Sequence, residues 1–129
     1  MLTLALDTAN DRVAVALAGD GREPVRAAAL SRGHAARLFP LIDEVLTTAG
    51  VEIGNVGRIA VNVGPGSFTG IRIAVAAGRG LGLALGVPVV GIDALRLIAA
   101  SLEEPAEGPI LAAVDARRGE AYAALYDTK

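Results

Sequence analysis

The 129-residue sequence is short of the residue types from which most metal and redox sites are built. It has no cysteine, which excludes disulfide bonds and thiolate metal ligands. Its single histidine, His34, excludes histidine clusters and the H-E-x-x-H zinc helix. Lys129 is the single lysine, so the chain has no G-x-x-x-x-G-K-[ST] phosphate loop. A metal site would therefore have to be built from carboxylates.

The charge and the apolar runs limit the setting in which the protein works. A formal net charge of −2 gives no general attraction to nucleic acid, so any RNA contact would be local or shared with a partner. Met1 leads directly into an apolar run without a basic flank, which predicts a strand rather than a signal peptide, and a cytoplasmic protein. Residues 71–92 are apolar, but Arg72, Arg79 and Pro88 interrupt them, which predicts a buried helix and no membrane span.

The apolar pattern predicts an α/β fold, with a meander of three antiparallel strands followed by alternating helices and strands. With 53% hydrophobic residues, the chain can bury about 70% of its unfolded surface in one core. Pro40 is expected to kink or restart the first helix, because it removes a backbone hydrogen bond. We expect strands at residues 2–7, 12–18, 24–30, 58–63 and 88–91, and helices at residues 34–49, 69–85 and 94–102.

A glycine-rich elbow joins the fourth predicted strand to the second predicted helix. Gly64 and Gly66 flank Pro65, and Ser67 or Thr69 can cap the helix that follows. Free N–H groups at such a helix start can bind a phosphate, but the spacing matches neither common phosphate loop and favours a plain strand-to-helix turn. The candidate cofactor-binding residues of the elbow are Gly64, Gly66, Ser67 and Thr69.

The end of the chain repeats its beginning. Residues 112–115 repeat the pattern of residues 4–7, and residues 120–125 repeat residues 12–17 at the same offset. A polar link at residues 103–108 precedes the second copy. The expected domains are a first lobe at residues 1–104 and, at residues 105–129, a linker with the first hairpin of a truncated, duplicated second lobe.

Two aspartates, Asp7 and Asp115, end equivalent strands of this repeat. If they face each other across a cleft between two lobes, they can hold Mg²⁺ on a nucleotide phosphate. Alternatively, each caps its own turn through side-chain hydrogen bonds. We favour the second interpretation, because no glycine follows either aspartate to let a phosphate approach the backbone.

The second predicted helix carries a ridge of small residues. Glycine costs up to about 1 kcal/mol relative to alanine inside a helix, so such a ridge implies that another backbone or sheet lies very close. The ridge fits either internal packing on the sheet or a helix interface with a partner protein. Its members, which recur every four residues, are Gly70, Ala74, Gly78 and Gly82.

Four motifs together resemble a known family. They are Leu-Ala-Leu-Asp-Thr-Ala at residues 4–9, Ser-Arg-Gly-His at residues 31–34, Gly-Pro-Gly-Ser-Phe-Thr-Gly-Ile-Arg at residues 64–72 and Asp-Ala-Arg-Arg-Gly-Glu at residues 115–120. In this order they resemble the bacterial tRNA threonylcarbamoyladenosine biosynthesis proteins of the TsaB, or YeaZ, family. The resemblance covers essentially the whole sequence. It implies an actin-like ATPase, ribonuclease H-like fold of two similar lobes, in agreement with the repeat.

The resemblance also implies a function. TsaB proteins look like inactive paralogues of TsaD, which transfers a threonylcarbamoyl group to the adenosine next to the anticodon in tRNAs that read codons starting with A. TsaD holds a metal with two histidines four residues apart, and the corresponding positions here fall at or next to Ala94 and Ile98. Neither side chain can bind a metal. The expectation is a scaffold that activates TsaD and has no catalytic or metal-binding residues of its own.

The family further implies that the chain pairs with TsaD through the first two helices. TsaE then joins the complex, and tRNA is bound only through the complex. A homodimer is also expected, because the predicted last hairpin at residues 110–127 would present unpaired strand edges that can pair with another copy of the chain. No cofactor is required, although the fold allows ATP or ADP with Mg²⁺. The predicted interface comprises His34, Arg37, Leu38, Leu41, Val45, Gly70, Ala74, Gly78 and Gly82.

Two other functions stay open. The same fold serves nucleotide-dependent phosphotransferases and ATPases, so an enzyme of that class is the strongest alternative. A glycopeptidase-like hydrolase has the least support. Gly66 and Ser67 lack the spacing of a G-x-S-x-G nucleophile elbow, and the chain has no histidine cluster.

Overall fold

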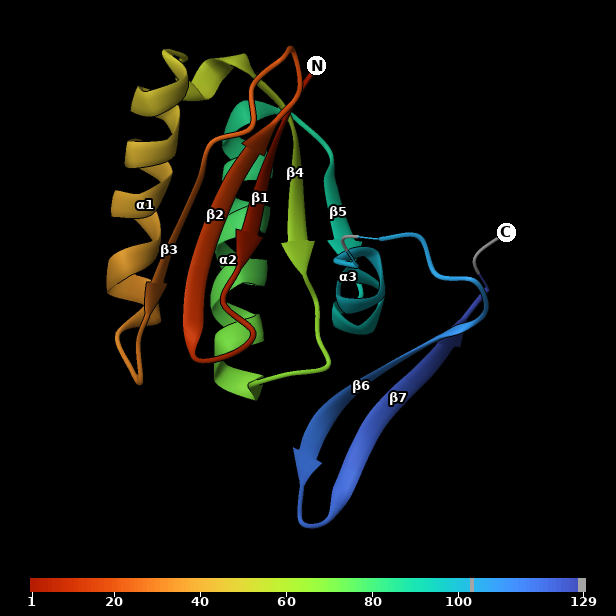
Figure 1. The fold of residues 1–129 in the computed structure, drawn as a ribbon. Coiled ribbons are helices and arrows are strands. Elements are labelled where there is room, and N and C mark those ends of the chain that lie inside the picture. The colour runs from red at the N-terminus through yellow and green to blue at the C-terminus, as the bar shows by residue number, and fades with distance from the viewer. Residues whose placement is uncertain (103, 128–129) are drawn as a thin grey trace.

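The computed structural model describes residues 1–102 and 104–127, so Glu103 of the predicted link lies outside the described residues. The elements follow the predicted order, with boundaries within about two residues of the expected ones (Figure 1). The strands are β1 (Leu2–Asp7), β2 (Arg12–Ala18), β3 (Val25–Ala29), β4 (Val56–Asn62), β5 (Val89–Ile92), β6 (Ile110–Arg117) and β7 (Glu120–Tyr126). The helices are α1 (His34–Ala49), the 3-10 helix η1 (Ile53–Asn55), α2 (Phe68–Leu85) and α3 (Ala94–Ala100).

Strands β1 to β5 form one mixed sheet in the order β3-β2-β1-β4-β5. β1, β2 and β3 pair antiparallel, which confirms the predicted meander. β4 pairs parallel to β1, and β5 pairs parallel to β4. Parallel neighbours need a crossover connection, and α1 and α2 supply it. The predicted α/β class is therefore confirmed.

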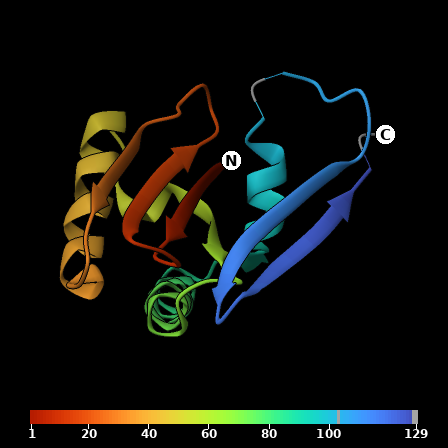
Figure 2. The ribbon, with the colours of Figure 1, turned by 60° about the horizontal axis from the view of Figure 1, so that its bottom comes forward.

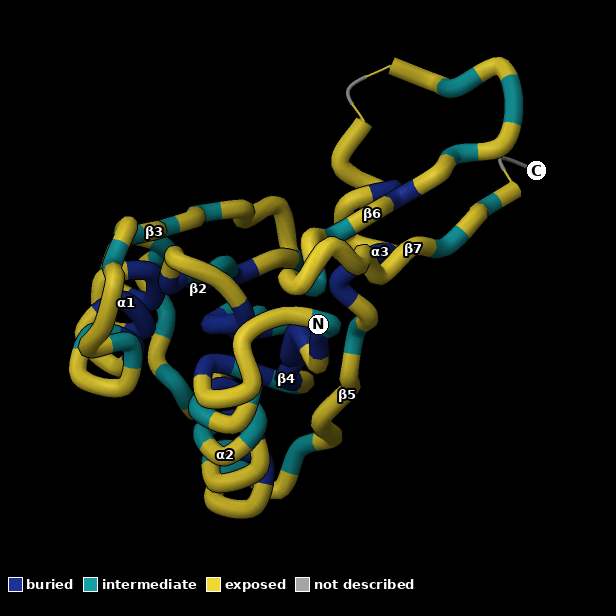
Figure 3. The backbone as a smooth tube through the Cα atoms, turned by 90° about the horizontal axis from the view of Figure 1, so that it is seen from below, coloured by how far each residue is buried: buried dark blue, intermediate teal, exposed yellow. Residues whose placement is uncertain are grey.

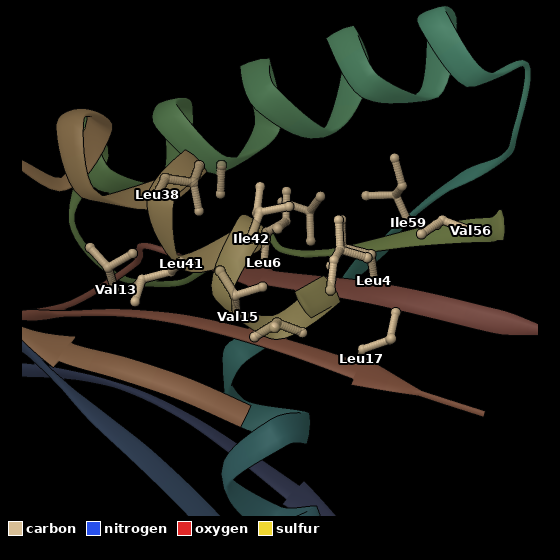
Figure 4. Close-up of a cluster of buried hydrophobic side chains, with 14 of the residues drawn as sticks. Leu4, Leu6, Val13, Val15, Leu17, Leu38, Leu41, Ile42, Val56 and Ile59 are labelled. Atoms are coloured by element: carbon tan, nitrogen blue, oxygen red, sulfur yellow. The ribbon is translucent and has the colours of Figure 1, made fainter. Parts of the chain in front are cut away.

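The main core lies between the sheet and the two longer helices (Figures 3 and 4). Side chains alternate between the faces of a strand, so Leu4 and Leu6 of β1 point to the same side as Val15 and Leu17 of β2. All four are at most 1% exposed. Burying one such side chain contributes about 1.5–3 kcal/mol. The core contains no aromatic residue among its buried members, so aliphatic packing alone holds the helices on the sheet.

The helix ends agree with the sequence. The Ser67 side chain caps α2 by accepting from the Gly70 N–H, and Gly86 ends the helix in the left-handed conformation at φ 68°. Asp93 caps α3. Pro40 lies inside α1, which runs without restart from His34 to Ala49, so the expected restart is wrong.

β6 and β7 form a separate two-stranded sheet beside α3 (Figure 2). A small second cluster joins them, in which Leu95 and Ala99 of α3 meet Ala112 of β6. The Tyr126 hydroxyl also donates to Asp93 at 3.4 Å. Partial burial and then the nearby Asp93 carboxylate raise the pKa of Tyr126. The division into two lobes stays a prediction.

By length and composition alone, α2 is a candidate membrane-spanning helix. In the structure its small residues pack on the sheet, while Arg72 and Arg79 are exposed. These contacts are those of a helix that belongs to the folded domain.

Candidate functional site

A cavity of about 520 Å³ lies where three segments meet: the β1–β2 turn, the start of α2 and the hairpin β6–β7. It brings together three of the predicted cofactor-binding residues, Gly66, Ser67 and Asp115. The aromatic rings of Phe68 and Tyr122 also line it. Its other lining residues are Ala9, Asn10, Asp11, Val114, Ala116 and Arg117.

The elbow before α2 makes its hydrogen bonds and close contacts with other segments of the protein. Gly64 has φ 89°, which favours glycine, and the Gly64–Pro65 peptide bond is cis. The Ser67 N–H donates to the Ala9 carbonyl at 2.6 Å. A Cβ at Gly66 would overlap the same carbonyl oxygen. These glycines therefore serve a tight turn and a close approach between two segments, and the N–H of Ser67 is already used.

Asp7 is engaged in hydrogen bonds that hold the ends of two strands together. One carboxylate oxygen accepts from the Ala9 N–H at 2.9 Å, and the other accepts from the Asn62 side chain at 3.0 Å. The Asn62 side-chain oxygen in turn accepts from the Gly64 N–H at 2.9 Å. Asn62 was not predicted as a site residue. Its signal in the sequence is an amide at the end of an otherwise apolar strand.

Asp115 makes the same local turn as Asp7 but lies elsewhere. Its carboxylate accepts from the Arg117 N–H at 2.8 Å. Asp7 lines a second, apolar cavity of about 160 Å³ on the opposite side of the sheet from α1 and α2, whereas Asp115 lines the 520 Å³ cavity. The structure therefore does not bring the two carboxylates together in one cavity, and both make the turn hydrogen bonds that we favoured.

The predicted partner interface needs correction on both helices. On α2, Gly70, Ala74, Gly78 and Gly82 are buried, and a Cβ at Gly78 would lie 2.5 Å from the Val61 side chain of β4. The ridge thus packs on the sheet inside the domain, because its missing side chains let the helix approach the strands. The ridge is not a surface that a partner could contact.

On α1, the three predicted apolar residues also belong to the core. Leu38, Leu41 and Val45 are at most 2% exposed and pack against the sheet. His34 and Arg37 are partly exposed, and Arg37 forms an ion pair with Glu44 at 3.2 Å. The apolar period of a helix identifies its buried face, so it pointed to the core rather than to the partner surface.

The comparisons with known proteins give the family. The family model of TsaD, tRNA N6-adenosine threonylcarbamoyltransferase, matches residues 10–129. The chain belongs to this family. It is 37% identical over 127 residues to the Escherichia coli (strain K12) tRNA threonylcarbamoyladenosine biosynthesis protein TsaB, a match that covers 98% of this chain and 55% of that protein. The Bacillus subtilis (strain 168) TsaB is 33% identical over 133 residues, covering 100% of this chain and 56% of that protein.

Solved structures agree. YeaZ from Pseudomonas aeruginosa superposes with a TM-score of 0.89 at 38% identity, covering 98% of this chain and 60% of that chain. Thermus thermophilus RuvC, at a TM-score of 0.51 and 15% identity, covers 81% of this chain and 73% of that chain and shares the fold alone. The predicted resemblance to TsaB and YeaZ is confirmed. The chain spans about half the length of the curated relatives it matches.

Within the TsaD family, α3 is informative for metal chemistry. Ala94 and Ile98, at or next to the positions that the resemblance assigns to the two TsaD histidines, lie one turn apart on this helix. Ala94 is buried and Ile98 is exposed. Across residues 1–102 and 104–127, the structure places no three histidine, cysteine or acidic side chains together as a metal-binding group.

Proposed function

We propose that this chain is a non-catalytic partner of TsaD that activates it for threonylcarbamoylation of the adenosine next to the anticodon in tRNAs reading codons that start with A. The similarity to TsaB along 98% of the chain carries this proposal. The apolar side chains of Ala94 and Ile98 support it, because a metal-dependent transferase would need ligands there.

The exposed sides of α1 and α2 are the surface that we propose for TsaD. Phe39 on α1 is 50% exposed and Phe68 on α2 is 74% exposed. The Arg72 guanidinium lies 5.1 Å from the centre of the Phe68 ring. Aromatic and arginine side chains are enriched at protein interfaces relative to the rest of the surface. We call Phe39, Phe68 and Arg72 the helix surface.

The rest of the assembly follows from the same proposal. TsaE joins the complex of the two proteins, and tRNA contacts this chain only through the complex, in keeping with the net charge of −2. The chain needs no cofactor for this role and works in the cytoplasm. In the absence of TsaD, the hairpin β6–β7 can also pair two copies of the chain, since Leu111 and Leu125 are each 69% exposed on it.

Isothermal titration of the chain with TsaD tests the proposal. The wild-type chain should bind, and a Phe39→Ala/Phe68→Ala double variant should bind at least about tenfold more weakly, because interface aromatics carry much of the binding energy. Leu125→Ala is the matched control, since Leu125 is 69% exposed on β7, in the separate two-stranded sheet. Absence of binding by the wild-type chain would contradict the proposal.

The phosphotransferase or ATPase alternative depends on the 520 Å³ cavity at the start of α2. It is tested by incubating the chain alone with ATP and Mg²⁺. We expect no turnover above buffer. ATP hydrolysis that disappears in Asp115→Asn, a change in a residue that lines this cavity, would replace the scaffold proposal with an enzymatic one.

A further inference from the structure

The β1–β2 turn, residues 8–11, is bonded to the first turns of both helices that cover the core. The Asn10 carbonyl lies 2.8 Å from His34 Nε2, at the first residue of α1. The Ala9 carbonyl accepts from the Ser67 N–H at 2.6 Å, at the cap of α2. One short turn therefore sets where both helices begin.

Thr8 makes the closest of these connections. It is completely buried, at 0% exposure, and its hydroxyl donates to the Gly70 carbonyl while accepting from the Ala74 N–H at 3.1 Å. In a regular α-helix the Ala74 N–H would donate directly to the Gly70 carbonyl. The Thr8 hydroxyl is thus inserted into one rung of the α2 hydrogen-bond ladder, a feature that bends or displaces a helix locally.

The sequence of α2 is adapted to this insertion. A Cβ at Gly70 would overlap the Thr8 carbonyl oxygen, so only glycine allows the strand end to come this close. Phe68 and Arg72 lie on the same two helical turns as Gly70 and Ala74. A change in the Gly70–Ala74 rung would therefore move the exposed aromatic ring and the guanidinium that lies over it.

We propose that Thr8 is a positioning residue for partner binding: its hydroxyl, held between Gly70 and Ala74, sets the place of the first two turns of α2 and hence of Phe68 and Arg72 relative to α1. This inference rests on the proposed function, because it assigns the effect to the surface that binds TsaD. Removing the hydroxyl lets the Ala74 N–H bond directly to the Gly70 carbonyl and displaces the start of α2.

Three chains test the proposal: the wild type, Thr8→Val, which removes the hydroxyl at similar size, and Thr8→Ser, which keeps it. In titrations with TsaD, Thr8→Val should raise the Kd about tenfold, whereas Thr8→Ser should restore binding to within about twofold of the wild type. A folded Thr8→Val that binds like the wild type would overturn the proposal. If Thr8→Val does not fold, Thr8→Ala takes its place, and wild-type binding by that variant would overturn the proposal equally.

Amide NMR of the same chains separates this inference from the proposed function. Thr8→Val should shift the amide resonances of residues 68–74 and speed hydrogen exchange at the start of α2, with Val45 of α1 unchanged as the internal reference. If the wild type does not bind TsaD, the proposed function fails, and these shifts still decide whether Thr8 positions α2. Unchanged resonances at residues 68–74 would overturn the positioning role.

Discussion

The first and last hairpins of this chain have similar sequences and different surroundings. Both contain an aspartate that accepts a hydrogen bond from the N–H two residues on, at 2.9 Å for Asp7 and 2.8 Å for Asp115. The first hairpin lies within the five-stranded sheet, whereas the last is a separate two-stranded sheet. Leu17 of β2 is completely buried, and Leu125, at the equivalent position of β7, is 69% exposed. Local sequence thus sets the turn, and neighbouring elements set the burial.

The same comparison separates the two carboxylates. Asp7 accepts a second hydrogen bond from Asn62, which ties β1 to β4. Asp115 is exposed and lines the larger cavity with Arg117. Two aspartates that look equivalent in sequence therefore differ in what they hold: Asp7 joins two strands of the sheet, whereas Asp115 stabilises only its own turn.

The two hairpins should differ most in stability when the equivalent leucines, Leu17 and Leu125, are each truncated to alanine. Leu17→Ala should lower the free energy of unfolding by about 2–5 kcal/mol, because it leaves a cavity in the core. Leu125→Ala should change it by less than about 0.5 kcal/mol, because the side chain is mostly in water. Urea unfolding followed by circular dichroism measures both. Similar losses in the two variants would mean that the last hairpin is buried in solution.

A second contrast lies within α2. Gly78→Ala should destabilise the chain by about 1–3 kcal/mol, since the new Cβ would lie 2.5 Å from Val61. Gly80 has no neighbouring atom within 4 Å of such a Cβ. Gly80→Ala should therefore stabilise the helix by up to about 1 kcal/mol. Thermal unfolding of the two variants gives the signs, and a neutral Gly78→Ala would contradict the close packing of the ridge on the sheet.

The aspartates give a smaller difference. Asp7→Ala should cost about 1–3 kcal/mol in the free energy of unfolding, because it leaves the Ala9 N–H and the Asn62 amide, both of buried residues, without their acceptor. Asp115→Ala removes one exposed hydrogen bond and should cost about 0.5–1 kcal/mol. Chemical denaturation of the two single variants is the measurement. A larger loss for Asp115→Ala would reverse the structural comparison.

The smallest effect is electrostatic and lies at the other end of the first hairpin. The N-terminal amine of Met1 donates to Asp20 at 2.8 Å, and its hydrogen bond and charge lower the pKa of that carboxyl. A lowered pKa stabilises the fold above the ordinary pKa of Asp20, and this contribution is lost as pH falls through the lowered value. Acetylating the N-terminus should raise the pKa of Asp20, as a carbon-13 NMR titration would show. An unchanged titration would mean that the pair is absent in solution.

The strands, the helix caps and the family could be predicted from the sequence because their signals are local. These signals are the alternation of apolar and polar residues, glycines at helix ends and the motif at residues 64–72. Prediction from the sequence failed where the answer depended on what packs against a residue. Gly78 and Leu41 were assigned to a partner surface, yet the sheet covers both. Thr8 was overlooked because its hydrogen bonds join positions more than sixty residues apart. Spacing along one helix cannot reveal such a contact.

We propose that this chain activates TsaD without catalysing the reaction itself. The most direct measurement is the amount of threonylcarbamoyladenosine formed in tRNA by TsaD and the other components of the reaction, with and without this chain. We predict that modification depends on adding the chain, survives Asp115→Asn in the candidate cavity, and falls with the Phe39→Ala/Phe68→Ala variant. Equal modification with and without the chain would contradict an activating role.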